Sequence, residues 1–308
     1  MKKTFLKKTF LFSLPIVLFI LSFEALLRHI PNDYKYKKTF LDQKSNTIQT
    51  LFLGSSHAYF GLNPIYMHTN SFNASYFSQT IKYDIEILKK YDGHWDRLQY
   101  IVIPISYFTL FSNLETDIES WRVKNYTLYC NFKTSCTIKD YSEFLSNNFK
   151  INLLKLYSYY QVNQNTITCS ELGFGLDYHS KSLIDLQKSG IEAVKRHTAK
   201  DFRHFEENMN YLTNLIQYAS SHNIKILLFT PPAFHTYADN LNKEQLNKTI
   251  SSIETTVKAY PNVYYFNFLT NPDFIEEDFY DADHLDDVGA KKLTLKIDSI
   301  ITNNLQIK

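Results

Sequence analysis

The chain of 308 residues lacks the residue patterns that mark several classes of function. It has only three cysteines and no C-x-x-C pair, which gives little support to a zinc site or a thioredoxin-like redox site. Its formal net charge is +2 and no Lys/Arg run is long, so we expect no nucleic-acid partner. Beyond the N-terminal region, no segment approaches the roughly 18 apolar residues of a membrane span. Function must therefore be inferred from local motifs and from the N-terminus.

The cysteines leave two states open. Cys130 and Cys136 are six positions apart and would close a small disulfide loop if the domain lies in an oxidising compartment. The alternative is three reduced thiols, Cys169 included.

Aromatic residues are abundant, at 16% of the chain with 23 Tyr and 24 Phe. Exposed aromatic faces suit sugar rings, so a glycan surface is one interpretation. Packing in the core is the other, because the sequence does not show which rings are exposed.

The N-terminus carries a basic stretch followed by an apolar run, which is the pattern of an export signal. No small-x-small cleavage site follows the run, and no cysteine precedes Cys130 to carry a lipid. We therefore predict an uncleaved signal anchor that spans residues 9–27. A buried core helix of a cytoplasmic protein is the alternative.

Charge around this segment suggests its orientation. Lys2, Lys3, Lys7 and Lys8 precede it, and basic residues near a span favour the cytoplasmic side. Arg28, Lys35, Lys37 and Lys38 follow it and weaken the asymmetry. We predict a cytoplasmic tail (1–8), the anchor (9–27), a polar linker (28–46) and an extracytoplasmic domain (47–308). The cytoplasmic membrane is thus the expected location, with most of the chain in the periplasm or outside the cell.

The rest of the chain alternates strands with helices, which predicts a mainly parallel sheet with helices on both faces, a three-layer α/β/α fold. The predicted strands are 47–53, 100–105, 224–229 and 263–268, and the predicted helices are 79–91, 205–221, 243–259 and 288–302. Residues from about 107 to 200 break this rhythm. We interpret them as an insertion over the sheet, with a lid and a substrate-binding cap as the two candidate roles.

A serine follows the first predicted strand. Reactive groups in open parallel sheets lie at the carboxyl ends of the strands. Ser56 occupies such a position in the stretch Gly54-Ser55-Ser56-His57, where the glycine permits a tight turn. A serine hydroxyl is a weak nucleophile that needs a base, and the base needs a partner to hold its tautomer.

The end of the chain offers that base and partner. Asp281 lies three residues before His284, between the last predicted strand and the last predicted helix. Asp283 competes with Asp281 for this role, or caps the following helix. Each motif alone is also compatible with a polar turn or a helix cap. Together they predict a Ser–His–Asp triad of Ser56, His284 and Asp281.

These blocks resemble the SGNH (GDSL-type) hydrolase superfamily. Gly54-Ser55-Ser56 matches its Gly-Asp-Ser block except at Ser55, and Asp281 and His284 match its Asp-x-x-His block. The resemblance covers residues 47 to about 302 without the middle third. It implies a three-layer α/β/α fold, a Ser56 nucleophile whose backbone N–H also serves the oxyanion hole, and no cofactor or metal.

Two further blocks depart from the family. In the second, Asn73 is kept and Ser78 replaces the glycine that supplies a backbone N–H to the oxyanion. In the third, the usual Asn is absent and Ser106 stands near its place, where its hydroxyl would have to donate. We group Asn73, Ser78 and Ser106, with His57, as the expected oxyanion and substrate-binding residues. Loss of one oxyanion donor costs about 10²–10³ in rate.

The anchor and the Gly-Ser-Ser block look like the membrane-anchored SGNH-like proteins of bacterial envelope-polysaccharide and teichoic-acid pathways. This resemblance implies an esterase or O-acyltransferase, in the first instance for acetyl groups, on a glycan or acylated wall polymer. A membrane acyltransferase is a possible partner. Two alternatives stay open: a catalytically impaired protein that binds a glycan or an assembly partner, and a metal hydrolase that uses Asp281, Asp283 and His284.

Overall fold

The computed structural model describes residues 2–133, 137–180 and 184–304. The chain divides into two compact units. Unit 1 comprises Met1–Thr39 and Ile118–Thr168, and unit 2 comprises Phe40–Asp117 and Cys169–Lys308. The predicted insertion at about 107–200 is therefore divided between them, because only its central part belongs to unit 1.

Unit 2 is built around a five-stranded sheet in the order β2-β1-β3-β4-β5, and every neighbouring pair of strands is parallel. The strands are β1 (Thr50–Phe52), β2 (Ser71–Asn73), β3 (Tyr100–Pro104), β4 (Lys225–Thr230) and β5 (Val263–Asn267). Nearly all residues of β1 to β4 are buried, as expected of a parallel sheet covered on both faces.

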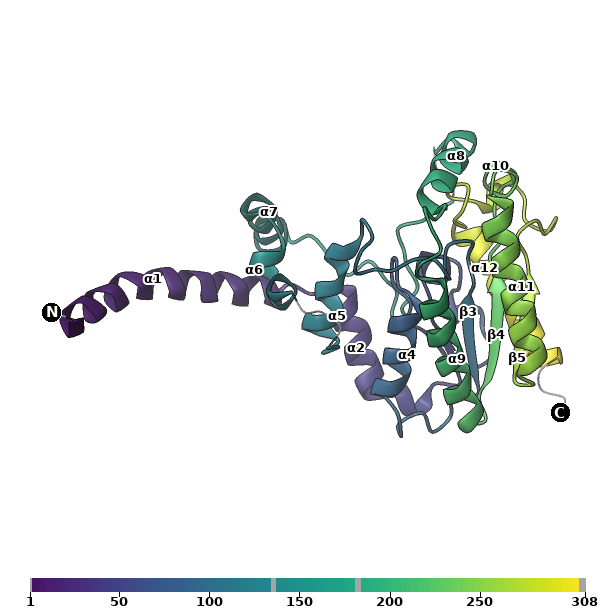
Figure 1. The fold of residues 1–308 in the computed structure, drawn as a ribbon, viewed down its shortest axis with the longest axis horizontal. Coiled ribbons are helices and arrows are strands. Elements are labelled where there is room, and N and C mark those ends of the chain that lie inside the picture. Colours follow the sequence, from purple (N-terminus) through teal and green to yellow (C-terminus); the bar gives the residue numbers. More distant parts are fainter. Residues whose placement is uncertain (1, 134–136, 181–183, 305–308) are drawn as a thin grey trace. The chain divides into compact units, whose positions relative to one another are not determined.

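Side chains alternate between the two faces along each strand. Phe52, Val102 and Leu227 belong to one apolar cluster with Leu293 and Ile297 of the last helix. The intervening strand residues are buried as well, and on that side α4 and α9 lie together (Figure 1). The predicted three-layer α/β/α fold is confirmed.

The helices of unit 2 agree with the predicted alternation. They are α3 (Ser56–Tyr59), α4 (Ile81–Lys90), α8 (Leu186–His197), α9 (Phe205–Ser221), α10 (His235–Ala238), α11 (Lys243–Ala259) and α12 (Asp287–Asn304). The sequence did not predict α3, α8, α10 or the short strand β2.

Unit 1 is helical in the part that the structure describes. Its helices are α1 (Lys2–His29), the first half of α2 (Asp33–Lys44), α5 (Val123–Tyr129), α6 (Glu143–Ser146) and α7 (Phe149–Tyr160). The predicted linker at 28–46 is largely the helix α2, with Tyr34, Lys37 and Leu41 buried. Burial of the apolar stems in this lysine-rich segment explains why it is helical and not an extended stalk.

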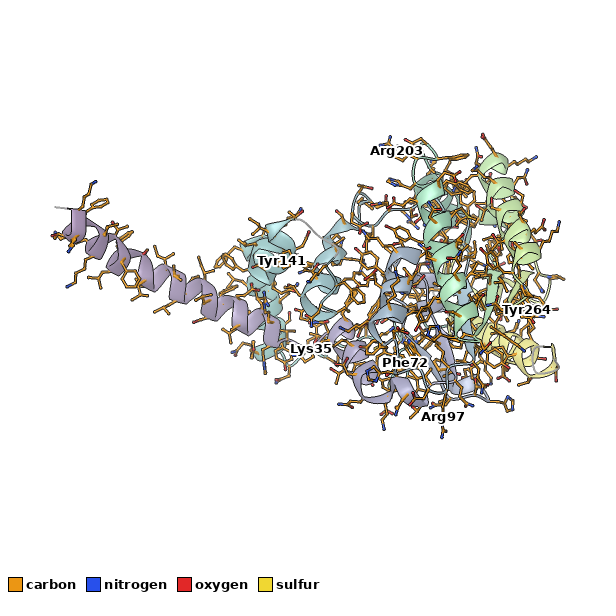
Figure 2. The ribbon with its side chains drawn as sticks, turned by 60° about the horizontal axis from the view of Figure 1, so that its bottom comes forward. Lys35, Phe72, Arg97, Tyr141, Arg203 and Tyr264 are labelled. Atoms are coloured by element: carbon orange, nitrogen blue, oxygen red, sulfur yellow. The ribbon has the colours of Figure 1, made fainter. Side chains whose placement is uncertain are left out.

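Helix α1 is long and apolar enough to cross a membrane. Only 11% of its most apolar 18-residue window is buried, and Figure 2 shows its side chains projecting outward along most of its length. Its last turns differ, because Phe23, Leu27 and Ile30 form a small core with Phe144, Leu156 and Tyr159. The C-terminal end of the candidate span is thus a structural part of unit 1.

Candidate functional site

The turn after β1 places Ser56 at the carboxyl edge of the sheet, as the first residue of α3. Gly54 makes this turn with φ +107°, a conformation that favours glycine. A Cβ at this position would lie 2.9 Å from the ring of Pro104 at the end of the neighbouring strand β3. Both constraints explain why a glycine precedes the serine.

A buried carboxyl group holds the same turn from behind. The Gly54 N–H donates to Asp84 Oδ1 over 2.9 Å, and Gln79 Nε2 donates to the same oxygen over 2.6 Å. Burial raises the pKa of Asp84 to about 7, against these hydrogen bonds. Asp84 of α4 thus supports the position of the Ser56 turn.

His284 and Asp281 lie in a short hairpin before α12. Phe279 and Leu285 form an antiparallel bridge, and the Tyr280 N–H donates to the His284 carbonyl over 3.0 Å. The Ala282 carbonyl accepts from the Phe234 N–H over 2.9 Å, and the Ala282 N–H donates to Ser189 Oγ over 3.1 Å. The hairpin is therefore fastened both to the segment after β4 and to α8.

These elements bring three side chains into a hydrogen-bonded chain. Ser56 Oγ lies 2.8 Å from His284 Nε2, and His284 Nδ1 lies 2.9 Å from Asp281 Oδ1. Asp281 Oδ1 also accepts from the His284 backbone N–H over 2.8 Å, which fixes the carboxylate relative to the ring. Such an arrangement holds Nδ1 protonated and leaves Nε2 to accept a proton from the serine.

The three acidic residues of this region have separate positions. Asp281 contacts His284 directly, whereas Asp283 Oδ2 lies 3.5 Å from His284 Nδ1. Asp286 caps α12, because its Oδ1 accepts from the backbone N–H groups of Val288 and Gly289. Asp283 is therefore not the helix cap that the sequence allowed.

Asp283 is instead buried among histidines. Its Oδ2 lies 3.5 Å from His57 Nε2, 3.5 Å from His284 Nδ1 and 3.8 Å from His197 Nδ1. Neither carboxylate oxygen has a hydrogen-bond partner among the described residues. The sequence did not predict the contribution of His197, which comes from the last turn of α8.

Two residues of this cluster carry a charge at pH 7, the His284 imidazolium and the Asp283 carboxylate. Burial alone would lower the pKa of His284, but Asp281 and Asp283 outweigh burial and raise this pKa to about 9. Burial opposes the charge of Asp283, yet the neighbouring histidines hold its pKa well below the usual range. Burial lowers the pKa of His57 and lowers that of His197 to about 4, so both are neutral at pH 7.

The neutral His57 determines what Ser106 can do. With Asp283 facing Nε2, the favoured tautomer carries its hydrogen there and leaves Nδ1 as an acceptor. Ser106 Oγ lies 2.6 Å from this Nδ1 and the residue is 2% exposed, so in this tautomer the Ser106 hydroxyl donates to His57. The expected donation by Ser106 to an oxyanion, and a direct substrate contact by His57, do not fit this arrangement.

Asn73 also differs from its expected role. Its side-chain amide donates to the carbonyls of Ala58 and Leu62, over 2.8 Å each, and its Oδ1 accepts from Ser75. Both amide hydrogens are used and the residue is fully buried. Asn73 therefore positions the segment after the Ser56 helix and does not offer a donor to a substrate.

Ser78 adopts the left-handed conformation with φ +55° and is half-buried. This is the conformation in which glycine is usually found. The resemblance to SGNH hydrolases expected a glycine at this position, and the backbone N–H is present with serine as well.

Aromatic rings adjoin the His284 side chain. Tyr178 stacks between Phe60, at 3.6 Å between ring centroids, and Tyr280, at 3.8 Å. The edge of this stack meets the His284 ring, with 5.4 Å between the centroids of Tyr178 and His284. No local sequence pattern marks this stack, because its members come from three separate segments.

Three side chains of this site lie close enough together to bind a metal ion. One ligand atom each of His57, Asp283 and His284 lie within 4.8 Å of one another. This set replaces Asp281 of the metal alternative with His57. The nitrogens of His284 already contact Ser56 and Asp281, so a metal would compete with the hydrogen-bonded chain.

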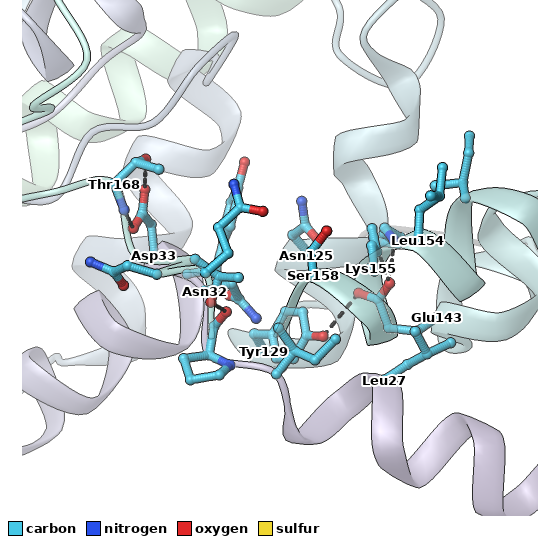
Figure 3. A pocket seen from close by; sticks show the side chains of 18 of the residues that line it. Leu27, Asn32, Asp33, Asn125, Tyr129, Glu143, Leu154, Lys155, Ser158 and Thr168 are labelled. Atoms are coloured by element: carbon cyan, nitrogen blue, oxygen red, sulfur yellow. Dashed lines mark hydrogen bonds and ion pairs between the residues drawn. The ribbon is translucent and has the colours of Figure 1, made fainter. Parts of the chain in front are cut away.

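A separate pocket of about 530 Å³ lies in unit 1 and shares no residue with the Ser56 site. Glu143 projects into it and is paired with the buried Lys124 at 2.6 Å and with Tyr129 Oη at 2.9 Å (Figure 3). The predicted Cys130–Cys136 disulfide cannot be described, because Cys136 lies outside the described residues.

No protein-family model and no curated protein matches the chain. Among solved structures, it is similar to a putative platelet activating factor from Streptococcus pneumonia, at 13% identity and a TM-score of 0.42, covering 93% of this chain and 97% of that one. It is also similar to a putative acylhydrolase from Bacteroides fragilis, at 9% identity and a TM-score of 0.39, covering 85% and 94%. A likeness this distant assigns no activity to the chain.

Proposed function

We propose that the chain is a serine-dependent acyl-ester hydrolase or O-acyltransferase. The observation that carries the proposal is the hydrogen-bonded chain from Asp281 through His284 to Ser56 at the carboxyl edge of a parallel sheet. A serine, a base and an orienting carboxylate in this order have the geometry needed for nucleophilic acyl transfer.

In the proposed reaction, His284 Nε2 takes the Ser56 proton while Ser56 Oγ bonds to the acyl carbonyl carbon. The ester C–O bond then breaks, and the departing alcohol receives the proton from His284. Water or a sugar hydroxyl next gives its proton to His284 and attacks the acyl carbon. The bond from this carbon to Ser56 Oγ then breaks, and His284 returns the proton to Ser56. Asp281 holds the ring and stabilises the imidazolium in both steps.

The backbone N–H groups of Ser56 and Ser78 are the proposed oxyanion donors. Ser106 and Asn73 are engaged with His57 and with backbone carbonyls, so neither adds a donor. A site with one donor fewer than the family pattern is expected to be slower by about 10²–10³.

The proposed substrate is an O-acyl ester, in the first instance acetyl, on a cell-envelope or extracellular polysaccharide. An N-terminal helix suited to a membrane supports a membrane-bound substrate or product. Four lysines before the apolar run favour a cytoplasmic N-terminus, which would place unit 2 on the outer side of the cytoplasmic membrane.

The test compares Ser56→Ala with Ser55→Ala on p-nitrophenyl acetate and on an acetylated glycan. Ser55 Oγ is buried and lacks a hydrogen-bond partner among the described residues, so it is a matched control. We expect Ser56→Ala to lose activity and Ser55→Ala to keep it. Full activity in Ser56→Ala would exclude the proposal.

A non-catalytic role is the second candidate, and the engagement of Ser106 by His57 favours it. The protein would then bind a glycan or an assembly partner without turning it over. Glycan binding that is equal in the wild type and in Ser56→Ala, with no acyl release by either, would support this alternative.

A further inference from the structure

Helix α7 is mostly apolar and yet largely exposed, with one polar stripe of Asn152, Lys155 and Ser158. Asn152 is its one buried residue. Its exposed side chains include Phe149, Ile151, Leu153, Leu154, Tyr157 and Tyr160. A helix that is apolar all round normally lies in a protein core or in a membrane.

Both ends of α7 contact the last turns of α1. The Phe149 ring lies 5.5 Å from the ring of Phe23, centroid to centroid, and Tyr160 Oη donates to the Leu26 carbonyl over 3.2 Å. These contacts lie within unit 1 and tie α7 to the C-terminal end of the candidate membrane span.

Glu24 of α1 holds the start of the adjoining helix α6 against the last turns of α1. Its carboxylate accepts from the backbone N–H groups of Glu143 and Phe144, over 3.0 and 2.8 Å, and from Ser142 Oγ over 2.8 Å. Arg28 donates to the same carboxylate. An acidic residue within an apolar run is costly in lipid unless it is paired, and here its partners come from α6 and from α1 itself.

Depth follows from the helix geometry. Phe23 is four residues before Leu27, which is about 6 Å along the axis of an α-helix. If α1 spans the bilayer up to Leu27, the Phe149 end of α7 lies about 6 Å inside its edge, within the roughly 5–10 Å at which interfacial helices are buried. The Tyr160 end, which contacts Leu26, lies about 1.5 Å inside the edge. We propose that α7 is a second membrane contact, lying in the boundary between lipid headgroups and acyl chains beside α1.

The side chains of α7 suit this boundary. Tyr157, Tyr159 and Tyr160 end the helix, and tyrosines are enriched at the membrane interface. Lys150 is exposed and long enough to reach headgroup phosphates, whereas Lys155 is paired with Glu143 at 3.4 Å. A protein partner would have to cover the apolar residues on several sides of the helix, whereas lipid covers all of them at once.

The test is photocrosslinking of the full chain in lipid discs of phosphatidylethanolamine and phosphatidylglycerol. A diazirine amino acid replaces Leu153 or Tyr157, which are four positions apart on one helix face. Leu18 of α1 is the positive control. Ile65 of unit 2 is the negative control, since it is 69% exposed and Tyr157 is 61% exposed.

We expect phospholipid adducts at Leu153 and Tyr157 with yields of the same order as at Leu18 and on the order of tenfold above Ile65. Adducts at Leu18 but not at either α7 position would overturn the proposal, as would crosslinks from α7 to protein alone. Absence of adducts at Leu18 would also overturn it, because the inference depends on α1 in the bilayer. The substituted side chains are exposed, so folding is not at risk.

Discussion

At the residue scale, two carboxylates act on one imidazole. Asp281 and Asp283 raise the pKa of His284 to about 9, so the imidazolium is the main form at pH 7. The neutral form is the one that can accept the Ser56 proton. The proposed activity should therefore rise as the pH increases through about 9.

Asp283→Asn tests the origin of this shift. With one negative charge removed, the His284 imidazolium is less stabilised. The pKa of His284 therefore falls, and the pH profile of kcat/KM moves to lower pH. Asp281→Asn is the comparison. It removes the hydrogen bond to Nδ1 and should lower kcat by about 10⁴ across the pH range. A profile that keeps its position in Asp283→Asn would contradict the role given to this carboxylate.

Ser78→Gly tests the left-handed turn. Serine at φ +55° is strained by about 1 kcal/mol, and glycine relieves this strain while it keeps the backbone N–H. We expect unchanged kcat/KM and a stability equal to the wild type or higher by up to about 1 kcal/mol in urea unfolding. Ser251→Gly, within α11, should instead lose roughly 0.5 kcal/mol. Destabilisation by Ser78→Gly would show that the strain is absent.

Sequence reasoning found Ser56, Asp281 and His284 because each stands in a local pattern, at a strand end or at a spacing of three. It did not find His197, because this residue joins the site through α8, which has no pattern linking it to the others. The role of Ser106 also depends on a neighbour, His57, whose tautomer the sequence does not determine.

At the element scale, the turn between β1 and α3 positions Ser56, the proposed nucleophile. Gly54→Ala adds a Cβ at φ +107° that would lie 2.9 Å from Pro104. Gly93 also has a positive φ, +75°, but an added Cβ there meets nothing within 4 Å. A comparison of Gly93→Ala with Gly54→Ala therefore separates the stability cost of backbone strain from that of steric overlap.

We expect Gly93→Ala to lose about 1 kcal/mol of stability from strain alone. Gly54→Ala should lose more and should also reduce kcat, because its turn carries Ser56. Urea unfolding and ester hydrolysis measure the two effects. Equal stability losses, with activity kept in both variants, would contradict the steric argument.

Helices α9 and α11 have the predicted bounds because each is long and strongly periodic. Strand β2 has three residues, too few for an alternation to be recognised. The segment before β1 reads as polar in sequence, but α2 buries Tyr34, Lys37 and Leu41. Strand β2 and helix α2 depend on tertiary contacts, which no local sequence pattern encodes.

At the scale of the whole molecule, the chain joins a sheet unit with a candidate active site to a helical unit that includes α1. The sequence predicted the sheet unit and the apolar segment. It did not predict that residues 118–168 fold with the N-terminal segment, because their contacts join distant parts of the chain.

Glu24→Ala should destabilise the start of helix α6 in unit 1. It removes the acceptor for two backbone N–H groups at the start of α6, which is worth about 1–2 kcal/mol for a helix cap. Hydrogen exchange at Glu143 and Phe144 should become faster, while the sheet of unit 2 keeps its protection. Glu24→Gln retains one acceptor oxygen and should show a smaller effect. Equal exchange in all three proteins would exclude the cap.

The central claim is that His284, oriented by Asp281, activates Ser56. Mass spectrometry after treatment of the full chain with a fluorophosphonate tests it most directly. We expect phosphonylation at Ser56 in the wild type and in Ser55→Ala, and its loss in His284→Ala. Ser56 left unmodified in the wild type, or modified equally without His284, would contradict it.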